Sequence, residues 1–250
     1  MPRKTVKKPI ESQLIQKRVK QKSSMTIKYH IVLNEEQKEA KREIYANPIT
    51  IITGKAGSGK TQVAIITALD MLFKGDVKKI FITRPMVTRE ELGFLPGDIK
   101  EKLEPILLPI YDCMNNATDR EKIDKAFLDK EIEIAPIAFM RGRTIENAIL
   151  IIDEAQNIDD ESMKMCLTRI GKNGKIVICG DVGQIDLKNK TLSGMFFIAS
   201  LDGKVNGLKL CNLKANHRNP IVEELLEQYD NRDAALANYK IIKGNKFGIN

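Results

Sequence analysis

The chain has 250 residues, of which 42% are hydrophobic and 30% are charged, so it is long enough for one substantial domain with a real core. This composition excludes a disordered chain, a collagen-like repeat and a coiled coil. Residues 1–30 hold nine of the 41 basic residues and one of the 33 acidic ones, so the other 220 residues carry 32 of each. We therefore expect a flexible basic arm over 1–30, a neutral folded domain over 31–230 and a tail over 231–250.

The cysteine content and the apolar runs of the sequence also indicate a cellular compartment. The four cysteines are far apart and there are two histidines, so neither a zinc site nor a disulfide framework is expected. Free thiols suit a reducing cytoplasm. No apolar run approaches the ~18 residues of a membrane span, and the N-terminus lacks the apolar stretch of a secretory signal. We expect a cytoplasmic protein without a membrane partner, although the basic residues 1–25 leave an organelle-targeting segment open.

Hydrophobic runs and turn residues predict strands that alternate with helices. Strands are predicted at 49–53, 79–83, 131–134, 149–152, 175–179 and 208–213. Helices are predicted at 35–45, 60–73, 159–170 and 221–229, and at 98–130 in two pieces interrupted by Pro105, Pro109 and Asn115–Asn116. This alternation predicts an α/β fold with a mostly parallel sheet and helices on both faces.

The segment 54–61 reads Gly-Lys-Ala-Gly-Ser-Gly-Lys-Thr and matches the phosphate-loop motif G-x-x-x-x-G-K-[ST] without a mismatch. It follows a predicted strand and opens a predicted helix, as the motif requires. Glycines let backbone N–H groups surround a phosphate, and the helix N-terminus adds its positive dipole end. Lys60 can bridge the β- and γ-phosphates, and the Thr61 hydroxyl can ligate Mg²⁺. The predicted nucleotide-binding residues are Gly54, Ala56, Gly57, Ser58, Gly59, Lys60, Thr61 and Gln62.

Two carboxylates, Asp153 and Glu154, follow the buried strand predicted at 149–152. Ligands of open α/β sheets sit at the carboxyl ends of the strands. We predict that Asp153, with Thr61, holds Mg²⁺ and that Glu154 polarises the attacking water. The alternative is that both acids only begin a surface helix. A water-activating glutamate favours a hydrolase over a nucleotide kinase.

A polar segment, 180–184, ends the next strand and offers a group that could sense the γ-phosphate or the attacking water. Gln184 is our choice, because an amide can orient water as both donor and acceptor. Asp181 is the second candidate. A simple Gly-Asp turn is the alternative without function.

Two further residues have a functional and a structural interpretation each. Gln37 could read an adenine edge, but Asn34-x-x-Gln37 is also a capping-box pattern. Arg218, between the last strand and the last helix, could stabilise γ-phosphate charge or could be an ordinary surface arginine.

Taken together, these motifs resemble the nucleotide-binding half of a superfamily 1 helicase and, more narrowly, the PhoH family of phosphate-starvation-inducible ATPases. The resemblance covers about residues 33–230. It rests on segments 83–85 (Thr-Arg-Pro), 92–98 (Leu-Gly-Phe-Leu-Pro-Gly-Asp), 135–144, 153–157 (Asp-Glu-Ala-Gln-Asn) and 167–171.

The resemblance implies a RecA-like core, often assembled as a homo-hexameric ring, and ATP hydrolysis with Mg²⁺ coupled to single-stranded RNA. It favours an adenine contact for Gln37 and a γ-phosphate contact for Arg218. We therefore expect an ATPase with helicase-like or RNA-remodelling action. An ATP-regulated ribonuclease, a nucleotide-switched assembly protein and a small-molecule nucleotide kinase are the alternatives.

The sequence also departs from the family pattern. Residues 86–91 replace a longer, glycine-containing acidic stretch, and 106–108 lack the usual aromatic and arginine. Both segments bear on nucleic-acid contacts. No second RecA-like domain is present, so neighbouring subunits would have to supply the second face. Roles for Arg141, Arg143 and Arg169 stay open between a subunit interface, phosphate, RNA and plain surface charge. Arg84 is expected near the nucleic acid.

Overall fold

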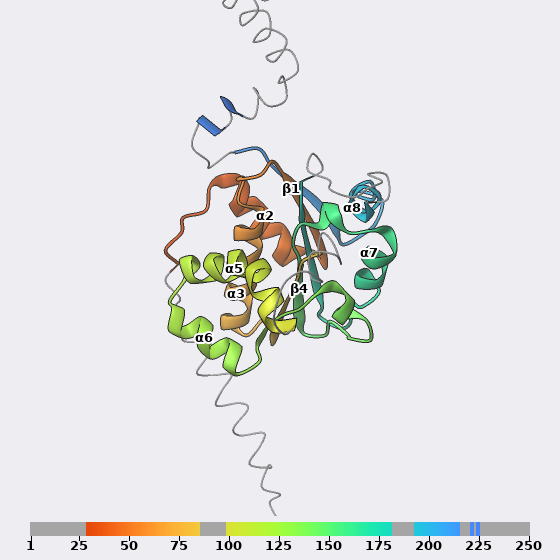
Figure 1. The fold of residues 1–250 in the computed structure, drawn as a ribbon. Helices are drawn as coiled ribbons and strands as arrows, with labels where there is room; N and C mark the ends of the chain where they lie inside the picture. Colours follow the sequence, from red (N-terminus) through yellow and green to blue (C-terminus); the bar gives the residue numbers. More distant parts are fainter. Residues whose placement is uncertain (1–28, 86–98, 182–192, 216–220, 223, 226–250) are drawn as a thin grey trace, which may run out of the picture. The chain divides into compact units, whose positions relative to one another are not determined.

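The computed structural model describes residues 29–85, 99–181, 193–215, 221–222 and 224–225 (Figure 1). The chain divides into two units, Met1–Lys214 and Ala215–Asn250. The fold described below is that of the first unit. The predicted boundaries at residues 30 and 230 stay predictions.

Six strands of the first unit form one sheet in which every pairing is parallel. The strands are β1 (Ile49–Gly54), β2 (Lys79–Thr83), β3 (Ile132–Ile134), β4 (Ala148–Ile152), β5 (Lys175–Gly180) and β6 (Leu208–Leu213). Their order across the sheet is β3-β2-β4-β5-β1-β6. The six predicted strands are therefore confirmed, with boundaries shifted by at most one residue. One strand, β5, separates β1 from β4.

Helices cover both faces of the sheet, as the strand pattern predicted (Figure 1). Alternate residues of each strand face opposite sides: Ile149 and Ile151 belong to one core, Leu150 and Ile152 to the other. The first core is closed by α2 (Glu35–Ala46), α3 (Lys60–Lys74), α5 (Ile99–Ala117) and α6 (Arg120–Leu128). The second is closed by η1 (Ile137–Met140), η2 (Ala155–Asn157), α7 (Asp160–Leu167) and α8 (Gly194–Ala199).

The prediction of two helical pieces within 98–130 is confirmed, but the interruption predicted at Pro105, Pro109 and Asn115–Asn116 is wrong. Helix α5 runs from Ile99 to Ala117, and α6 begins at Arg120. A proline inside a helix costs about 3 kcal/mol because it lacks an N–H donor. The helix continues because Ile110, Met114 and Ala117, spaced by four and three residues, are fully buried in the first core.

Other comparisons with the prediction concern short elements and helix ends. Helix α7 ends at Leu167 rather than at residue 170, and it begins after Asp159, whose side chain accepts a 2.7 Å hydrogen bond from the backbone N–H of Ser162. Helix α8 and the two 3-10 turns η1 and η2 were not predicted. Of the predicted helix 221–229, the described residues 221–222 and 224–225 are helical.

Lys175, the first residue of β5, closes the C-terminal end of α2. Its ammonium donates hydrogen bonds of 2.9 Å to the carbonyl oxygens of Ile44, Tyr45 and Asn47. Burial lowers the pKa of this ammonium. Since α2 has no basic residue in its own last turn, the cation that complements its dipole comes from the sheet.

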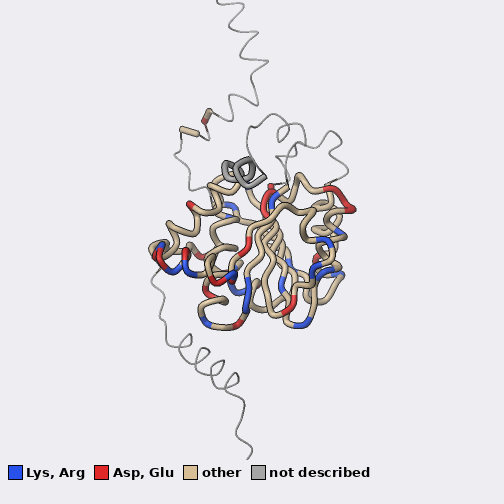
Figure 2. Tube along the Cα trace, turned by 60° about the horizontal axis from the view of Figure 1, so that its bottom comes forward, with Lys and Arg blue, Asp and Glu red and all other residues tan. Residues whose placement is uncertain are grey.

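The charges of the described residues are mixed. Lys and Arg are interspersed with Asp and Glu along the described part of the trace (Figure 2). None of the helices that the structure describes combines the length and apolar character needed to span a membrane.

Candidate nucleotide site

The phosphate-loop motif forms the turn between β1 and α3, as predicted. Gly57 and Gly59 have φ angles of 88° and 83°, in the left-handed region that favours glycine. Gly54 has a φ of 152° and lies so close to β6 that an added Cβ would be 2.5 Å from the carbonyl oxygen of Leu213. The Gln37 side-chain amide packs against Gly59 in the same way, so these glycines allow close approach of neighbouring groups to the loop.

Two polar groups of the loop fit a bound phosphate chain. The Lys60 ammonium donates to the carbonyl oxygens of Gly54, at 2.7 Å, and Lys55, at 3.0 Å, and so lies across the loop. The Ser58 hydroxyl is buried and has no hydrogen-bond partner among the described residues. A buried polar atom without a partner is costly, and a ligand phosphate would satisfy it.

Thr61 and Asp153 join the phosphate loop to the acidic strand end. The Thr61 hydroxyl donates a 2.6 Å hydrogen bond to Oδ1 of Asp153, which is 5% exposed at the end of β4. Burial raises the pKa of the Asp153 carboxyl, and the Thr61 hydrogen bond opposes that rise. A hydroxyl and a carboxylate oxygen are hard ligands, so this pair fits Mg²⁺.

Glu154 follows Asp153 and is held by two side chains. Its backbone is left-handed, with φ 51° and ψ 40°. Oε1 accepts a hydrogen bond of 3.1 Å from Nη2 of Arg84, and Oε2 accepts one of 2.6 Å from Nε2 of Gln156. The side-chain Oε1 of Gln156 accepts in turn from the backbone N–H of Asp181, at 3.1 Å. Groups from the ends of β2, β4 and β5 thus form one chain of contacts.

Gly180 leaves space for this series of contacts. A Cβ on Gly180, the last residue of β5, would lie 2.8 Å from Oε1 of Gln156 and would also collide with the sulfur of Met195. Gln156 is 2% exposed, so its amide has little freedom to move away. The position therefore tolerates no side chain without displacing Gln156 or α8.

Gln37 forms the capping box that was one of its two interpretations. Asn34 Oδ1 accepts from the Gln37 backbone N–H at 2.8 Å, and Gln37 Oε1 accepts from the Asn34 backbone N–H at 3.1 Å. The Gln37 amide also donates to the Ser58 carbonyl oxygen at 3.2 Å. Gln37 therefore buttresses the phosphate loop from the start of α2, and its adenine contact stays a prediction.

The remaining predicted residues divide into two groups. Gln184 and Arg218 lie outside the described residues, so their roles stay predictions. Arg141 is exposed, and the Arg169 guanidinium donates to the Thr168 hydroxyl at 3.2 Å. Arg143 forms an ion pair with Glu133 and lies 5.6 Å from the centre of the Phe81 ring.

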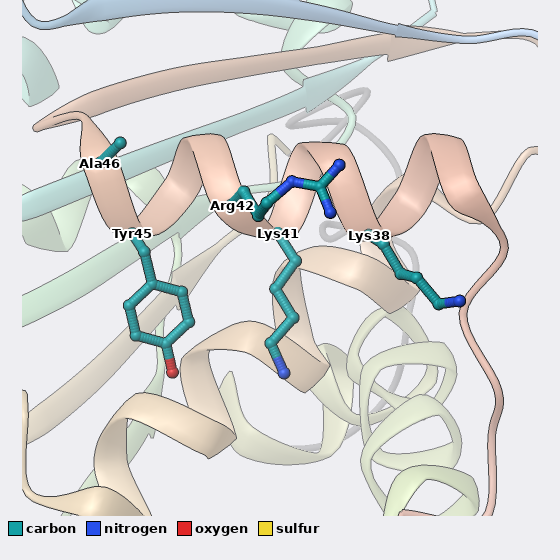
Figure 3. Close-up of a pocket in the computed structure, with 5 residues that line it drawn as sticks. All are labelled: Lys38, Lys41, Arg42, Tyr45 and Ala46. Carbon is teal, nitrogen blue, oxygen red and sulfur yellow. The ribbon is translucent and has the colours of Figure 1, made fainter.

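A hollow of about 550 Å³ lies on another part of the first unit, along α2 (Figure 3). Its three basic side chains are paired: Lys38 with Glu35, Lys41 with Asp70 and Arg42 with Glu39. Tyr45, also in its wall, donates to Asp70 at 3.2 Å. Because its cations are already matched by acids, the hollow is a poor candidate for a phosphate site.

The fold and the site define a P-loop NTPase with a RecA-like core. The phosphate loop follows β1, the paired acids follow β4, and β5 lies between these strands. The comparison with known families is more specific: residues 31–230 match the model of the PhoH-like protein family, and the chain belongs to that family.

Curated relatives agree with this assignment. A PhoH-like protein of Bacillus subtilis (strain 168) is 40% identical over 200 residues, which are 79% of this chain and 63% of the relative. One from Synechocystis sp. is 38% identical over 78% of this chain and 60% of its own length. Protein PhoH of Escherichia coli (strain K12) is 41% identical over 65% of this chain and 47% of its own length. Matches to this chain thus span about three-fifths or less of these relatives.

Solved structures include more distant likenesses. The UvsW helicase from Bacteriophage T4 matches with a TM-score of 0.47 at 14% identity, over 79% of this chain and 67% of that chain.

Two residues of the site were not among the predicted site residues. Arg84 was expected beside nucleic acid, and its contacts with Asp153 and Glu154 depend on β2 pairing with β4, which the sequence does not reveal. Gln156 carried a usable signal: it lies two residues after Glu154 in the motif that supports the family resemblance.

Proposed function

We propose that this chain binds ATP with Mg²⁺ and hydrolyses it. The observation that carries the proposal is the hydrogen bond between Thr61 and Asp153, which brings the phosphate loop and the acidic strand end into one site. The buried hydroxyl of Ser58, which has no hydrogen-bond partner in the described part of the chain, supports a phosphate ligand at the same place.

Each residue has a physical role in this proposal. The Lys60 ammonium leaves its carbonyl partners to neutralise charge on the β- and γ-phosphates. Thr61 and Asp153 hold Mg²⁺, which supplies charge neutralisation at the phosphate oxygens when bound. The Glu154 carboxylate accepts a proton from the attacking water. Gln37 steadies the loop through the Ser58 carbonyl.

We also propose that hydrolysis is coupled to single-stranded RNA. The basic residues 1–30 and the helicase-like motifs support an RNA partner, since clustered cations bind phosphate backbones. A homo-hexamer would let a neighbouring subunit supply a second face to the nucleotide site. The cytoplasm is the proposed location, supported by the four free cysteines.

Phosphate release tests the enzymatic proposal. The full chain is incubated with ATP and Mg²⁺, alone and with single-stranded RNA or DNA of defined length, while native mass measurement follows its assembly. Release of phosphate that RNA accelerates supports the proposal. Absence of release in every condition, from a folded hexamer that binds ATP, contradicts hydrolysis and favours a nucleotide-switched assembly protein.

The salt dependence of RNA binding tests the arm. If residues 1–30 contact about five phosphates of a single strand, deleting residues 1–28 flattens the slope of log K against log salt by ~3.5. Basal hydrolysis should survive the deletion. Cleavage of labelled RNA with Mg²⁺ but without ATP would instead favour a ribonuclease.

A further inference from the structure

The side chain of Glu154 is 37% exposed but is held at both carboxylate oxygens. Both carboxylate oxygens already accept hydrogen bonds, from Arg84 at 3.1 Å and from Gln156 at 2.6 Å. The residue also adopts a left-handed backbone, which is strained for a non-glycine residue and persists only where the surrounding structure holds it.

Of these two partners, Arg84 is the one that a ligand can reach. Its side chain is 24% exposed, whereas Gln156 is 2% exposed and anchored to Asp181. Within the described part of the chain, the Arg84 guanidinium pairs with both acids of the site, Glu154 at 3.1 Å and Asp153 at 4.0 Å. A guanidinium binds phosphate oxygens at least as well as carboxylates, so a phosphate that arrives here competes for it.

The position of Arg84 in the sheet indicates which phosphate competes. Arg84 follows β2, and both β4 and β5 separate β2 from the phosphate-loop strand β1. Arg84 approaches Oδ2 of Asp153, whereas Thr61 binds Oδ1. Three interstrand steps of roughly 4.8 Å thus separate the strand of Arg84 from the strand of the phosphate loop, which favours a phosphate from a second ligand over one held by the loop.

We propose that Arg84 is a positioning residue that restrains Glu154 until a backbone phosphate of single-stranded RNA takes its guanidinium. Release of the ion pair frees one carboxylate oxygen to accept the proton of the attacking water. The inference rests on the proposed function, since it explains how RNA accelerates ATP hydrolysis at this site.

Steady-state kinetics of Arg84→Gln and Arg84→Lys test the inference. Arg84→Gln should raise the basal kcat for ATP about five-fold, the effect of one partly exposed ion pair of about 1 kcal/mol. The KM for ATP should stay within about two-fold, and acceleration by RNA should fall toward one. Arg84→Lys should lie between the wild type and Arg84→Gln, because it keeps the charge without the fork.

RNA binding gives an independent readout that a merely structural role would not move. Arg84→Gln should flatten the slope of log K against log salt for single-stranded RNA by ~0.7, as expected for one phosphate contact. Arg42→Gln is the matched control, because Arg42 pairs with Glu39 on the exposed face of α2. This control should match the wild type in kcat, KM and slope.

The outcomes separate this inference from the proposed function. If the wild type hydrolyses ATP but Arg84→Gln is no faster, or is slower with a raised KM, Arg84 assists catalysis and the inference is wrong. If neither protein releases phosphate, with or without RNA, the proposed function fails and takes the inference with it. If the wild type releases no phosphate but Arg84→Gln does, the result would directly support the restraint of Glu154 by Arg84.

Discussion

The hydroxyl of Thr61 and the carboxylate of Asp153, 92 positions apart in the sequence, are joined by a hydrogen bond of 2.6 Å. Neither residue could reach the other within one strand or turn. The contact exists because β1 and β4 are parallel members of one sheet, so their carboxyl ends open on the same edge. The first three predictions concern the chemistry on this edge, and the last two concern the scaffold beneath it.

Lys60→Ala should abolish productive ATP binding. The substitution removes the ammonium that now spans the carbonyl oxygens of Gly54 and Lys55 and that would neutralise phosphate charge. We expect hydrolysis to fall by about 10²-fold or more. Fluorescent nucleotide titration and phosphate release measure the two effects. Lys78→Ala, at an exposed lysine before β2, is the control, and equal losses in both variants would contradict a specific role.

Glu154→Gln should keep ATP binding and slow hydrolysis by at least ~10², because an amide cannot take the proton of the attacking water. Single-turnover phosphate release after ATP binding isolates this step. Glu161→Gln, an exposed glutamate in the first turn of α7, should turn over normally. Normal turnover in Glu154→Gln would show that Glu154 is not the base.

Thr61→Val should weaken binding of ATP in the presence of Mg²⁺, because the substitution keeps the shape and removes the hydroxyl that meets Asp153. Thr61→Ser keeps the hydroxyl and should restore binding to within a few-fold. We expect a loss of roughly 10-fold for valine, measured by titration with and without Mg²⁺. A loss that is the same without Mg²⁺ would separate Thr61 from metal binding.

Asp70 predicts a pH dependence of stability. Burial alone would raise its pKa, but hydrogen bonds from Lys41 and Lys74 outweigh burial and hold the pKa below its usual value. The stabilisation is therefore complete above the unfolded pKa of about 4 and is lost as pH falls through the lowered folded value.

The variant Asp70→Asn isolates this contribution. We expect it to lower the free energy of unfolding by about 1–3 kcal/mol at pH 7. The difference from the wild type should shrink below about pH 4 in urea unfolding curves. Asp76→Asn, at an exposed aspartate after α3, should show neither effect. A difference that grows toward low pH would mean that the folded protein favours the protonated form of Asp70, contrary to its pairing with two lysines.

Lys175→Met should destabilise the fold, since three carbonyl oxygens at the end of α2 lose their donor. A loss of about 1–3 kcal/mol is expected from the unpaired carbonyls. Lys172→Met, at an exposed lysine shortly before β5, should be close to neutral. Urea unfolding at pH 7 compares the two, and equal stabilities would mean that water replaces the lost ammonium.

The sheet and the phosphate loop could be predicted because their signals are local. Runs such as 149–152 are continuous and β-branched, and Gly54–Thr61 is a fixed motif between a strand and a helix. Helix α5 could not be bounded in this way, because burial of Ile110 and Met114 outweighs the helix-breaking tendency of Pro109. Local helix propensity depends on Pro109 itself, whereas the burial of Ile110 and Met114 depends on the helix that packs against them.

The same contrast between local signals and contacts with distant elements applies to the residues of the site. The Thr61–Asp153 pairing follows from two motifs and one rule about sheet edges. The contact between Arg84 and Glu154 could not be predicted, because it depends on β2 lying beside β4 in the sheet. The two interpretations of Gln37 could be compared only once the structure showed its side chain bonded to both Asn34 and Ser58.

Strand β5 sets the distance between the phosphate loop and the paired acids at the carboxyl edge of the sheet. It lies between the strands of the phosphate loop and of the acids, so two interstrand steps of roughly 4.8 Å fix their separation. Its Cys179 thiol reaches the Lys60 carbonyl at 3.7 Å, and the residue after it, Gly180, leaves space for Gln156. A larger side chain at the end of β5 would therefore displace the phosphate loop and the paired acids relative to each other. The substituted residue itself would not contact the nucleotide.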